Sequence, residues 1–255
     1  MLTSVTVTGA DDSVKPIDLI QIARDFPYVE FGILLGNHFN ESRFPSAGWL
    51  HHLYMTAMKG CGQCLPAHLL RLSAHLCGSL VPEFLSGTAR LLPLVFGRMQ
   101  VNTYGIRHSH DPLHLRRNVL RANHSGIQVI FQYDQVNAES LSDCRDGSPG
   151  NFCSGLSIAA LFDLSHGMGV LPEVWPESLP GIPCGYAGGL SPENVAEELP
   201  KIAEAAGKGT PFWIDVETGV RSPDGSRFDL DRVVRFLEAT KPYIYSESLD
   251  AVGKT

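Results

Sequence analysis

Two glycine-containing turns in the C-terminal half carry residue types that bind phosphate. Gly188-Gly189 and Thr218-Gly219 each follow a short apolar stretch of chain. Paired glycines let the backbone approach an anion closely, and turn amides beside a helix N-terminus form an anion site. Thr218 adds a hydroxyl group that can donate a hydrogen bond. We therefore predict that Gly188, Gly189, Thr218 and Gly219 bind the phosphate group of a small molecule.

A carboxyl group stands where a third apolar stretch ends. Asp163 closes the run that begins at residue 158, and a loop follows it. Loss of water around a carboxyl group favours its protonated form, which can serve as a general acid. The sequence therefore predicts an acid–base role for Asp163 near the phosphate site.

These positions belong to a regular alternation of short apolar runs and longer amphipathic segments. The runs predict strands at 4–8, 29–35, 69–76, 98–103, 127–133, 158–164, 182–187 and 211–216. The amphipathic segments predict helices at 16–26, 46–58, 82–92, 111–123, 136–143, 191–206 and 229–240, with Ser191 and Asp229 as N-caps and Pro192 at the first helical position.

Eight strands that alternate with helices predict a parallel sheet closed into a (β/α)8 TIM barrel. A length of 255 residues suits one such barrel, so we expect residues 1–255 to form a single domain. The two glycine turns then follow strands seven and eight, where barrels of this kind often bind phosphate. An open doubly wound sheet is the alternative, but no Gly-x-Gly-x-x-Gly follows the first strand.

Composition narrows the range of partners and locations. The chain has 20 Lys and Arg against 27 Asp and Glu, a formal charge of −7 that disfavours binding to nucleic acid. It has no apolar run long enough to span a membrane and no secretory signal at the N-terminus. We therefore expect a cytoplasmic protein with reduced cysteines, whose partner is a phosphorylated small molecule.

Three stretches resemble the phosphoribosylanthranilate isomerase family. The segment 160–169, with Trp175 beyond it, resembles the family's sixth strand and glycine-rich loop. The segment 187–195 resembles its seventh-strand phosphate loop, and 214–220, with the helix from Asp229, resembles its eighth unit. The likeness covers roughly residues 158–240.

The resemblance implies an Amadori-type aldose–ketose isomerisation in tryptophan biosynthesis that needs no metal and no other cofactor. Asp163 matches the family's general acid. The family's general base is a cysteine before a glycine at the end of strand one, where this chain has Thr8. A threonine hydroxyl does not ionise near neutral pH, so Thr8 cannot replace a thiolate unaided. Arg43 and Gln100 match positions that contact the substrate.

Other strand ends offer groups that could act as the base. Asp11 follows strand one, His75 and Cys77 end strand three, and Asp134 ends strand five. His75 is favoured because a histidine titrates in the useful range without special help. Asp134 is also a candidate contact for the substrate.

Two other functions remain open from the residues. A metal-dependent hydrolase would use His108 and His110, with His114 nearby. Further ligands would come from strand ends, namely His75, Asp134, Asp163 and Asp215. A phosphosugar-binding barrel without catalysis would keep the phosphate turns and lack the base. The pair Cys61 and Cys64 has the spacing of a metal or redox motif, but no second ligand pair accompanies it, which favours a loop with two thiols.

Overall fold

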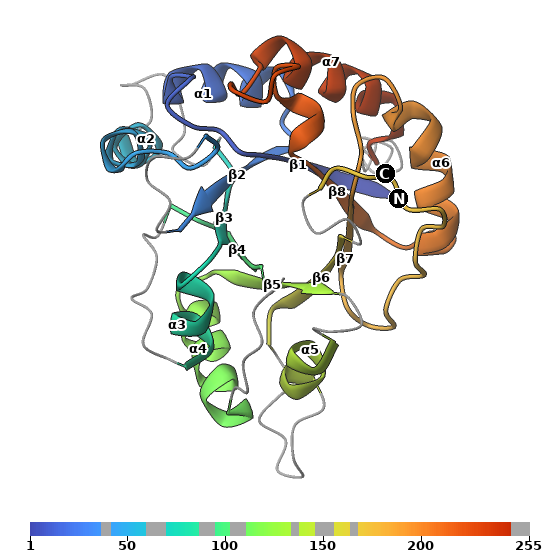
Figure 1. Cartoon of the computed structure of the whole chain (residues 1–255). Coiled ribbons are helices and arrows are strands. Elements are labelled where there is room, and N and C mark those ends of the chain that lie inside the picture. The colour runs from blue at the N-terminus through green and yellow to red at the C-terminus, as the bar shows by residue number, and fades with distance from the viewer. Residues whose placement is uncertain are drawn as a thin grey trace, which may run out of the picture.

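The eight strands form a closed parallel barrel, and the predicted (β/α)8 fold class is confirmed (Figure 1). The computed structural model describes residues 1–36, 42–59, 70–86, 95–102, 111–133, 138–145, 156–163 and 168–245. Neighbours in the sequence pair with each other, and the last strand pairs with the first. The strands are β1 (Leu2–Thr8), β2 (Val29–Leu35), β3 (Leu72–Leu76), β4 (Arg98–Val101), β5 (Gln128–Tyr133), β6 (Ile158–Asp163), β7 (Cys184–Ala187) and β8 (Phe212–Val216).

Helices cover the outside of the ring, as Figure 1 shows. They are α1 (Pro16–Asp25), α2 (Ala47–Lys59), α3 (Leu80–Ser86), α4 (Pro112–His124), α5 (Ala138–Arg145), α6 (Val195–Ala206) and α7 (Leu230–Thr240), with short 3-10 turns η2 (Thr218–Val220) and η3 (Lys241–Tyr243). Residues 168–183, before β7, contain no helix. Four prolines between positions 172 and 183 explain this, because proline removes a backbone donor. None of the helices in the described segments is long and apolar enough to cross a membrane.

The N-termini of the last two helices differ from each other. Asp229 caps α7 as predicted, and its side chain accepts from the amides of residues 231 and 232 at 3.1 Å. The prediction that Ser191 caps α6, with Pro192 at its first position, is wrong. Asn194 is the N-cap residue, because residues 191–194 form a turn in which Ser191 O accepts from the amide of Asn194 at 3.2 Å.

The lower part of the barrel interior is filled by charged and aromatic side chains. Arg98 on β4 donates to the Glu30 carboxylate on β2 at 2.7 Å, and its guanidinium lies 4.5 Å from the ring centre of Trp213. Gly185 on β7 has no side chain, and any Cβ there would collide with that indole ring. These side chains come from the first two residues of their strands, so this layer lies toward the amino-terminal end of the barrel.

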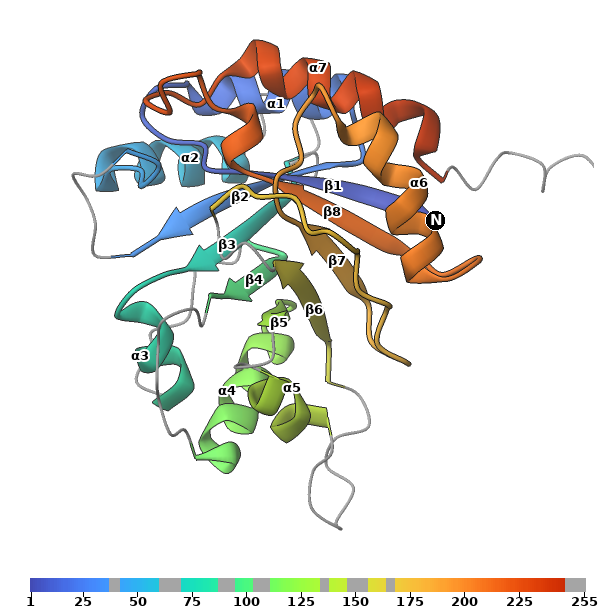
Figure 2. The same cartoon turned by 45° about the vertical axis from the view of Figure 1, so that its right-hand side comes forward.

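The first and last helices lie on one side of the barrel. Figure 2 shows α1 and α7 on the same side, outside β1 and β8. Tyr28, just before β2, donates its hydroxyl to Leu237 O on α7 at 2.7 Å. Strand β8 pairs with β1, so groups more than 200 positions apart in the sequence lie side by side.

Candidate active site

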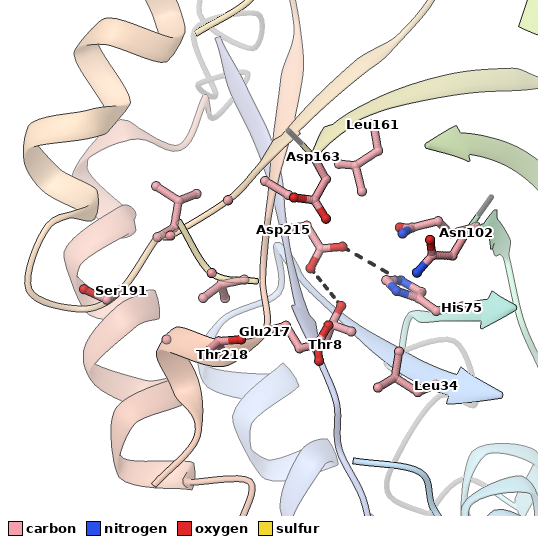
Figure 3. A pocket seen from close by; sticks show the side chains of 18 residues that line it. Thr8, Leu34, His75, Asn102, Leu161, Asp163, Ser191, Asp215, Glu217 and Thr218 are labelled. Carbon is pink, nitrogen blue, oxygen red and sulfur yellow. Dashed lines mark hydrogen bonds and ion pairs between the residues drawn. The ribbon is translucent and has the colours of Figure 1, made fainter. Parts of the chain in front are cut away.

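A cavity of about 200 Å³ opens at the carboxyl ends of the strands. Its walls come from the ends of β1, β2, β3, β4, β6, β7 and β8 and from the segments that follow β4, β6, β7 and β8. In this fold the loops at the carboxyl face carry function while the barrel below provides rigidity. Figure 3 shows the side chains that line the cavity.

The predicted phosphate turns touch each other in one wall of this cavity. Gly188 and Gly189 have φ values of 119° and 63°, which side chains rarely adopt. A Cβ on Gly189 would collide with the backbone of Leu171, and one on Gly219 would collide with the carbonyl group of Leu190. Both positions therefore require glycine because another backbone approaches closely.

Several backbone amides of these turns can donate a hydrogen bond to a ligand, whereas two of the carbonyl oxygens already accept hydrogen bonds from side chains. Among the described loop residues, the amides of Gly188, Gly189 and Gly219 have no hydrogen-bond acceptor. Asn194 Nδ2 donates to Gly189 O at 2.8 Å, and Arg232 Nε donates to Gly219 O at 2.9 Å. A rigid turn with unused amides suits an anion. The structure thus brings the predicted phosphate ligands together, and their binding of phosphate stays a prediction.

The segment after β6 lies against both turns. Gly169 has a φ of 68°, and a Cβ there would stand 3.1 Å from Cβ of Thr218. Two residues later, Leu171 is the residue whose backbone touches Gly189. Sequence reasoning gives this segment no phosphate-binding role, although its glycines are visible in the sequence.

Asp215, the fourth residue of β8, occupies the centre of the polar side of the cavity (Figure 3). Thr8 Oγ1 donates to Asp215 Oδ1 at 2.8 Å, and His75 Nε2 lies 3.9 Å from Asp215 Oδ2. Burial raises the pKa of Asp215 to about 8, although the hydrogen bond from Thr8 opposes the rise; the nearby Glu217 carboxyl contributes a smaller part of the increase. A carboxyl group with this pKa can exchange a proton near neutral pH.

His75 has the opposite shift. Burial, with a smaller effect from Arg98, lowers the pKa of His75 to about 3. The imidazole is therefore neutral at physiological pH, and its 3.9 Å contact with Asp215 is not a salt bridge. A group whose conjugate acid is this strong accepts protons poorly, so the chemistry favours Asp215 over His75 as the base.

Gly32 on β2 permits this arrangement. It pairs with Thr8 on β1 and with Ser73 on β3, so it separates the two strands that contribute Thr8 and His75. A Cβ on Gly32 would collide with Thr8 Oγ1 and His75 Nε2. The absence of a side chain therefore lets both groups reach the carboxyl group of Asp215.

Asp163 lies at the end of β6, and its carboxyl group faces the same cavity (Figure 3). Gln132 Nε2 on β5 lies 3.5 Å from Asp163 Oδ2, at the long limit for a hydrogen bond. Gln100 on β4 lines the cavity and is buried. The structure therefore places two of the cavity's carboxyl groups, on β6 and β8, beside the glycine turns.

Arg43 lies at the rim of the barrel and does not line the cavity. Its guanidinium donates to Glu217 Oε1 at 2.8 Å, and its amide donates to Asp11 Oδ2 at 3.2 Å. It has a φ of 87°, an unusual value for a residue with a side chain. Asp11 also accepts from the buried Arg221 at 2.9 Å, so this network ties the loops after β1, β2 and β8 together. Burial raises the pKa of Glu217, against the effect of Arg43.

Most of the predicted site residues line the same cavity. Eight of them line the cavity: Thr8, His75, Gln100, Asp163, Gly188, Gly189, Thr218 and Gly219. Arg43 reaches it only through Glu217. Sequence reasoning places Asp215 only in a metal cluster and gives Glu217 no role, although Asp215 lies in an apolar strand just as Asp163 does.

Some predicted residues lie outside the described part of the chain, namely Asp134, His108, His110, Cys61 and Cys64. His114 is described: it lies on α4 with Nδ1 3.4 Å from Asp111 Oδ2, and it is exposed. No three His, Cys, Asp or Glu residues within the described segments are grouped so that they could hold a metal ion.

Comparison with known proteins gives a local match and no family. No family model matches the chain. A multifunctional tryptophan biosynthesis protein from Phanerodontia chrysosporium is 40% identical over 65 residues. This match covers 26% of the present chain and only 7% of that much longer protein.

Solved structures resemble the chain only in overall form. The Amycolatopsis orientalis BexX/CysO complex is 13% identical with a TM-score of 0.43, over 94% of this chain and 89% of the other. A complex of a GH113 β-1,4-mannanase is 10% identical with a TM-score of 0.45, over 94% and 99%. At this level of similarity neither structure bears on what the chain does.

Proposed function

We propose that this barrel isomerises a phosphorylated sugar derivative from the aldose to the ketose form by general acid–base catalysis. Asp163 is the acid and Asp215 the base, and the turns at Gly188-Gly189 and Thr218-Gly219 hold the phosphate. The observation that carries the proposal is a single cavity in which two carboxyl groups and both glycine turns meet.

The two carboxyl groups suit opposite roles. Asp215 is buried, accepts a hydrogen bond from Thr8, and has a pKa of about 8. Its ionised fraction therefore grows as the pH rises toward 8, and the ionised form is a much stronger base than an ordinary aspartate. Asp163 stands at the end of β6, separated from β8 only by β7, and lies near Gln132. Asp215 can therefore act as the base where the resembled family uses a cysteine thiolate, and Thr8 does not need to ionise.

The proposed reaction uses one proton from Asp163 and transfers one proton to Asp215. Asp163 donates a proton to the ring oxygen of an N-glycosylated sugar, and the bond between that oxygen and C1 breaks to give an iminium ion. The Asp215 carboxylate then removes the proton from C2, and the electron pair forms the C1–C2 double bond of an enaminol. Tautomerisation moves the hydroxyl proton to C1 and yields the ketose. Asp215 then releases its proton to water and Asp163 takes one up, which restores both carboxyl groups to their starting states. The phosphate held by the turns fixes C1 and C2 relative to both carboxyl groups.

The local match to a tryptophan biosynthesis protein supports this reaction class. The resemblance of residues 158–240 to phosphoribosylanthranilate isomerases supports it as well, because Asp163 and both turns fall within that stretch. The departure at Thr8 agrees with a change of base, since the hydroxyl donates to Asp215.

The test is turnover of two substrates, the N-(5-phosphoribosyl) derivatives of aniline and of anthranilate, with the ketose product measured by chromatography. Asp163→Asn and Asp215→Asn should each reduce kcat/KM by about 10²–10⁴. Asp224→Asn is the matched control, because this carboxylate accepts hydrogen bonds from Ser222 and Ser226 and does not line the cavity. A wild-type rate on both substrates no greater than that of the two cavity variants would overturn the proposal. Binding of ribose 5-phosphate without turnover would indicate instead a barrel that only binds phosphosugars.

A further inference from the structure

Two buried polar atoms in the cavity wall formed by β3 and β4 lack a hydrogen-bond partner among the described residues. They are His75 Nε2 and Gln100 Oε1. The two residues are 3% and 7% exposed, and both line the cavity. Buried polar atoms in folded proteins nearly always have a hydrogen-bond partner. A ligand in the cavity is therefore expected to supply the partner of these two atoms.

The strand register brings the two side chains together. His75 on β3 pairs directly with Gln100 on β4, and both side chains face the cavity. Adjacent strands of a sheet lie about 4.8 Å apart, so one small ligand group can contact both side chains. The two unpartnered atoms therefore form one binding point rather than two.

The chemistry of the two atoms selects a hydroxyl group. Gln100 Oε1 can only accept a hydrogen bond, whereas the neutral imidazole of His75 carries one N–H that can donate. An ammonium group cannot accept, and a carbonyl or carboxylate oxygen cannot donate. A hydroxyl group can donate its hydrogen to Gln100 and accept from His75 Nε2 at the same time.

Asp215 lies next to this point, as Figure 3 shows. His75 Nε2 is 3.9 Å from Asp215 Oδ2, which is too long for a hydrogen bond, so the carboxyl group does not satisfy the imidazole. Thr8 donates to the other oxygen, Oδ1. A hydroxyl group between His75 and Gln100 would therefore lie beside the carboxyl oxygen that Thr8 leaves free.

We propose that His75 and Gln100 bind the hydroxyl group on C2 of the substrate, the carbon from which Asp215 removes a proton. The inference rests on the proposed function. His75 is then a hydrogen-bond donor to the oxygen that becomes the ketose carbonyl, and Gln100 accepts the hydrogen that this oxygen later loses. The substrate class narrows to phosphosugar derivatives that carry a 2-hydroxyl group, and 2-deoxy sugars are disfavoured.

Two sugar phosphates test this with the whole protein. Ribose 5-phosphate and 2-deoxyribose 5-phosphate differ only in the 2-hydroxyl group. Calorimetry should show that ribose 5-phosphate binds wild-type protein at least about tenfold more tightly, because the deoxy compound leaves two buried polar atoms without a partner. Equal affinity would mean that water or nothing occupies the point between His75 and Gln100, and it would overturn the inference.

Substitutions assign the preference to the two side chains. Gln100→Met keeps the approximate shape and removes the acceptor, and His75→Phe removes both ring nitrogens. Each should abolish most of the preference, mainly by weakening the binding of ribose 5-phosphate. His75→Gln supplies an N–H in a similar position and should restore part of the preference. A preference that persists in both Gln100→Met and His75→Phe would contradict the assignment.

Tyr186→Phe is the matched control. The Tyr186 hydroxyl is also buried and without a partner among the described residues, but Tyr186 does not line the cavity. Its removal should leave the ratio of the two affinities unchanged, and a lost preference in this variant would show that the ratio reports packing rather than contact with the sugar.

The same measurements separate this inference from the function on which it rests. If ribose 5-phosphate and its deoxy analogue bind equally well, the hydroxyl site is wrong while the phosphate site stands. If neither sugar phosphate binds, the proposed function fails and the inference fails with it.

Discussion

Replacing Asp215 with asparagine should change how the stability of the folded barrel depends on pH. Burial raises the pKa of Asp215 from 3.8 to about 8 in the folded protein. Between these values the folded state keeps a proton that the unfolded chain has released. The contribution of Asp215 to stability is therefore fully present below about pH 4 and is lost as the pH rises through 8.

The size of the change in unfolding free energy follows from the pH range between the unfolded and folded pKa values of Asp215. Each pH unit within it lowers the free energy of unfolding by about 1.4 kcal/mol. Over about four pH units the loss has an upper bound near 6 kcal/mol, a large share of the stability of a typical domain. Asparagine has the same shape and can still accept the hydrogen bond from Thr8, but it does not ionise. Asp215→Asn should thus gain stability relative to wild type as the pH rises from 4 to 8.

Urea unfolding at a series of pH values from 4.5 to 9 measures the effect. The quantity of interest is the difference in unfolding free energy between variant and wild type, because a constant offset from altered packing cancels in its slope. Asp224→Asn is the control: hydrogen bonds from Ser222 and Ser226 lower the pKa of Asp224 to about 2, so its titration lies below the measured range. A difference for Asp215→Asn that is as flat as the control's would refute the reasoning.

Other substitutions have equally definite outcomes. Gly189→Ala places a Cβ against backbone at a φ of 63°, so it should destabilise the barrel by about 1–3 kcal/mol and weaken binding of ribose 5-phosphate, measured by thermal unfolding and calorimetry. His75→Gln should make the loss of stability on acidification shallower between pH 6.5 and 3, by up to about 1.4 kcal/mol per pH unit, because the folded imidazole stays neutral until about pH 3; an unchanged acid-unfolding curve would contradict this. Arg221→Met leaves the Asp11 carboxylate without its buried partner and should cost about 3–5 kcal/mol in urea unfolding, and a cost near zero would show that the pair is not a structural tie.

The order of strands could be read from the sequence because it follows from local patterns. Alternating apolar runs and amphipathic segments occur along the chain itself, and eight such units leave few parallel arrangements other than a closed barrel. The helix cap at Asp229 could be predicted for the same reason, because its side chain accepts hydrogen bonds from amides only two and three residues later. The cap of α6 was misplaced because Asn194 is chosen by its bond to Gly189 O, a contact of the loop rather than of the helix.

The role of Asp215 could not be read in this way. Its pKa depends on burial inside a ring that closes only when β8 pairs with β1. Its hydrogen bond to Thr8 joins residues 207 positions apart, and the approach of His75 depends on a glycine in the strand between. No residue pattern near position 215 of the sequence indicates these contacts.

The sequence by itself thus determined the barrel, the glycine turns after its last two strands and the carboxyl group at Asp163, because each depends on residue type and near neighbours. Tertiary structure alone decided that Asp215 titrates near pH 8 and that Arg43 is held by Glu217. The physical reason is that desolvation and charge pairing depend on which groups surround an atom in space, and closure of the barrel sets those neighbours.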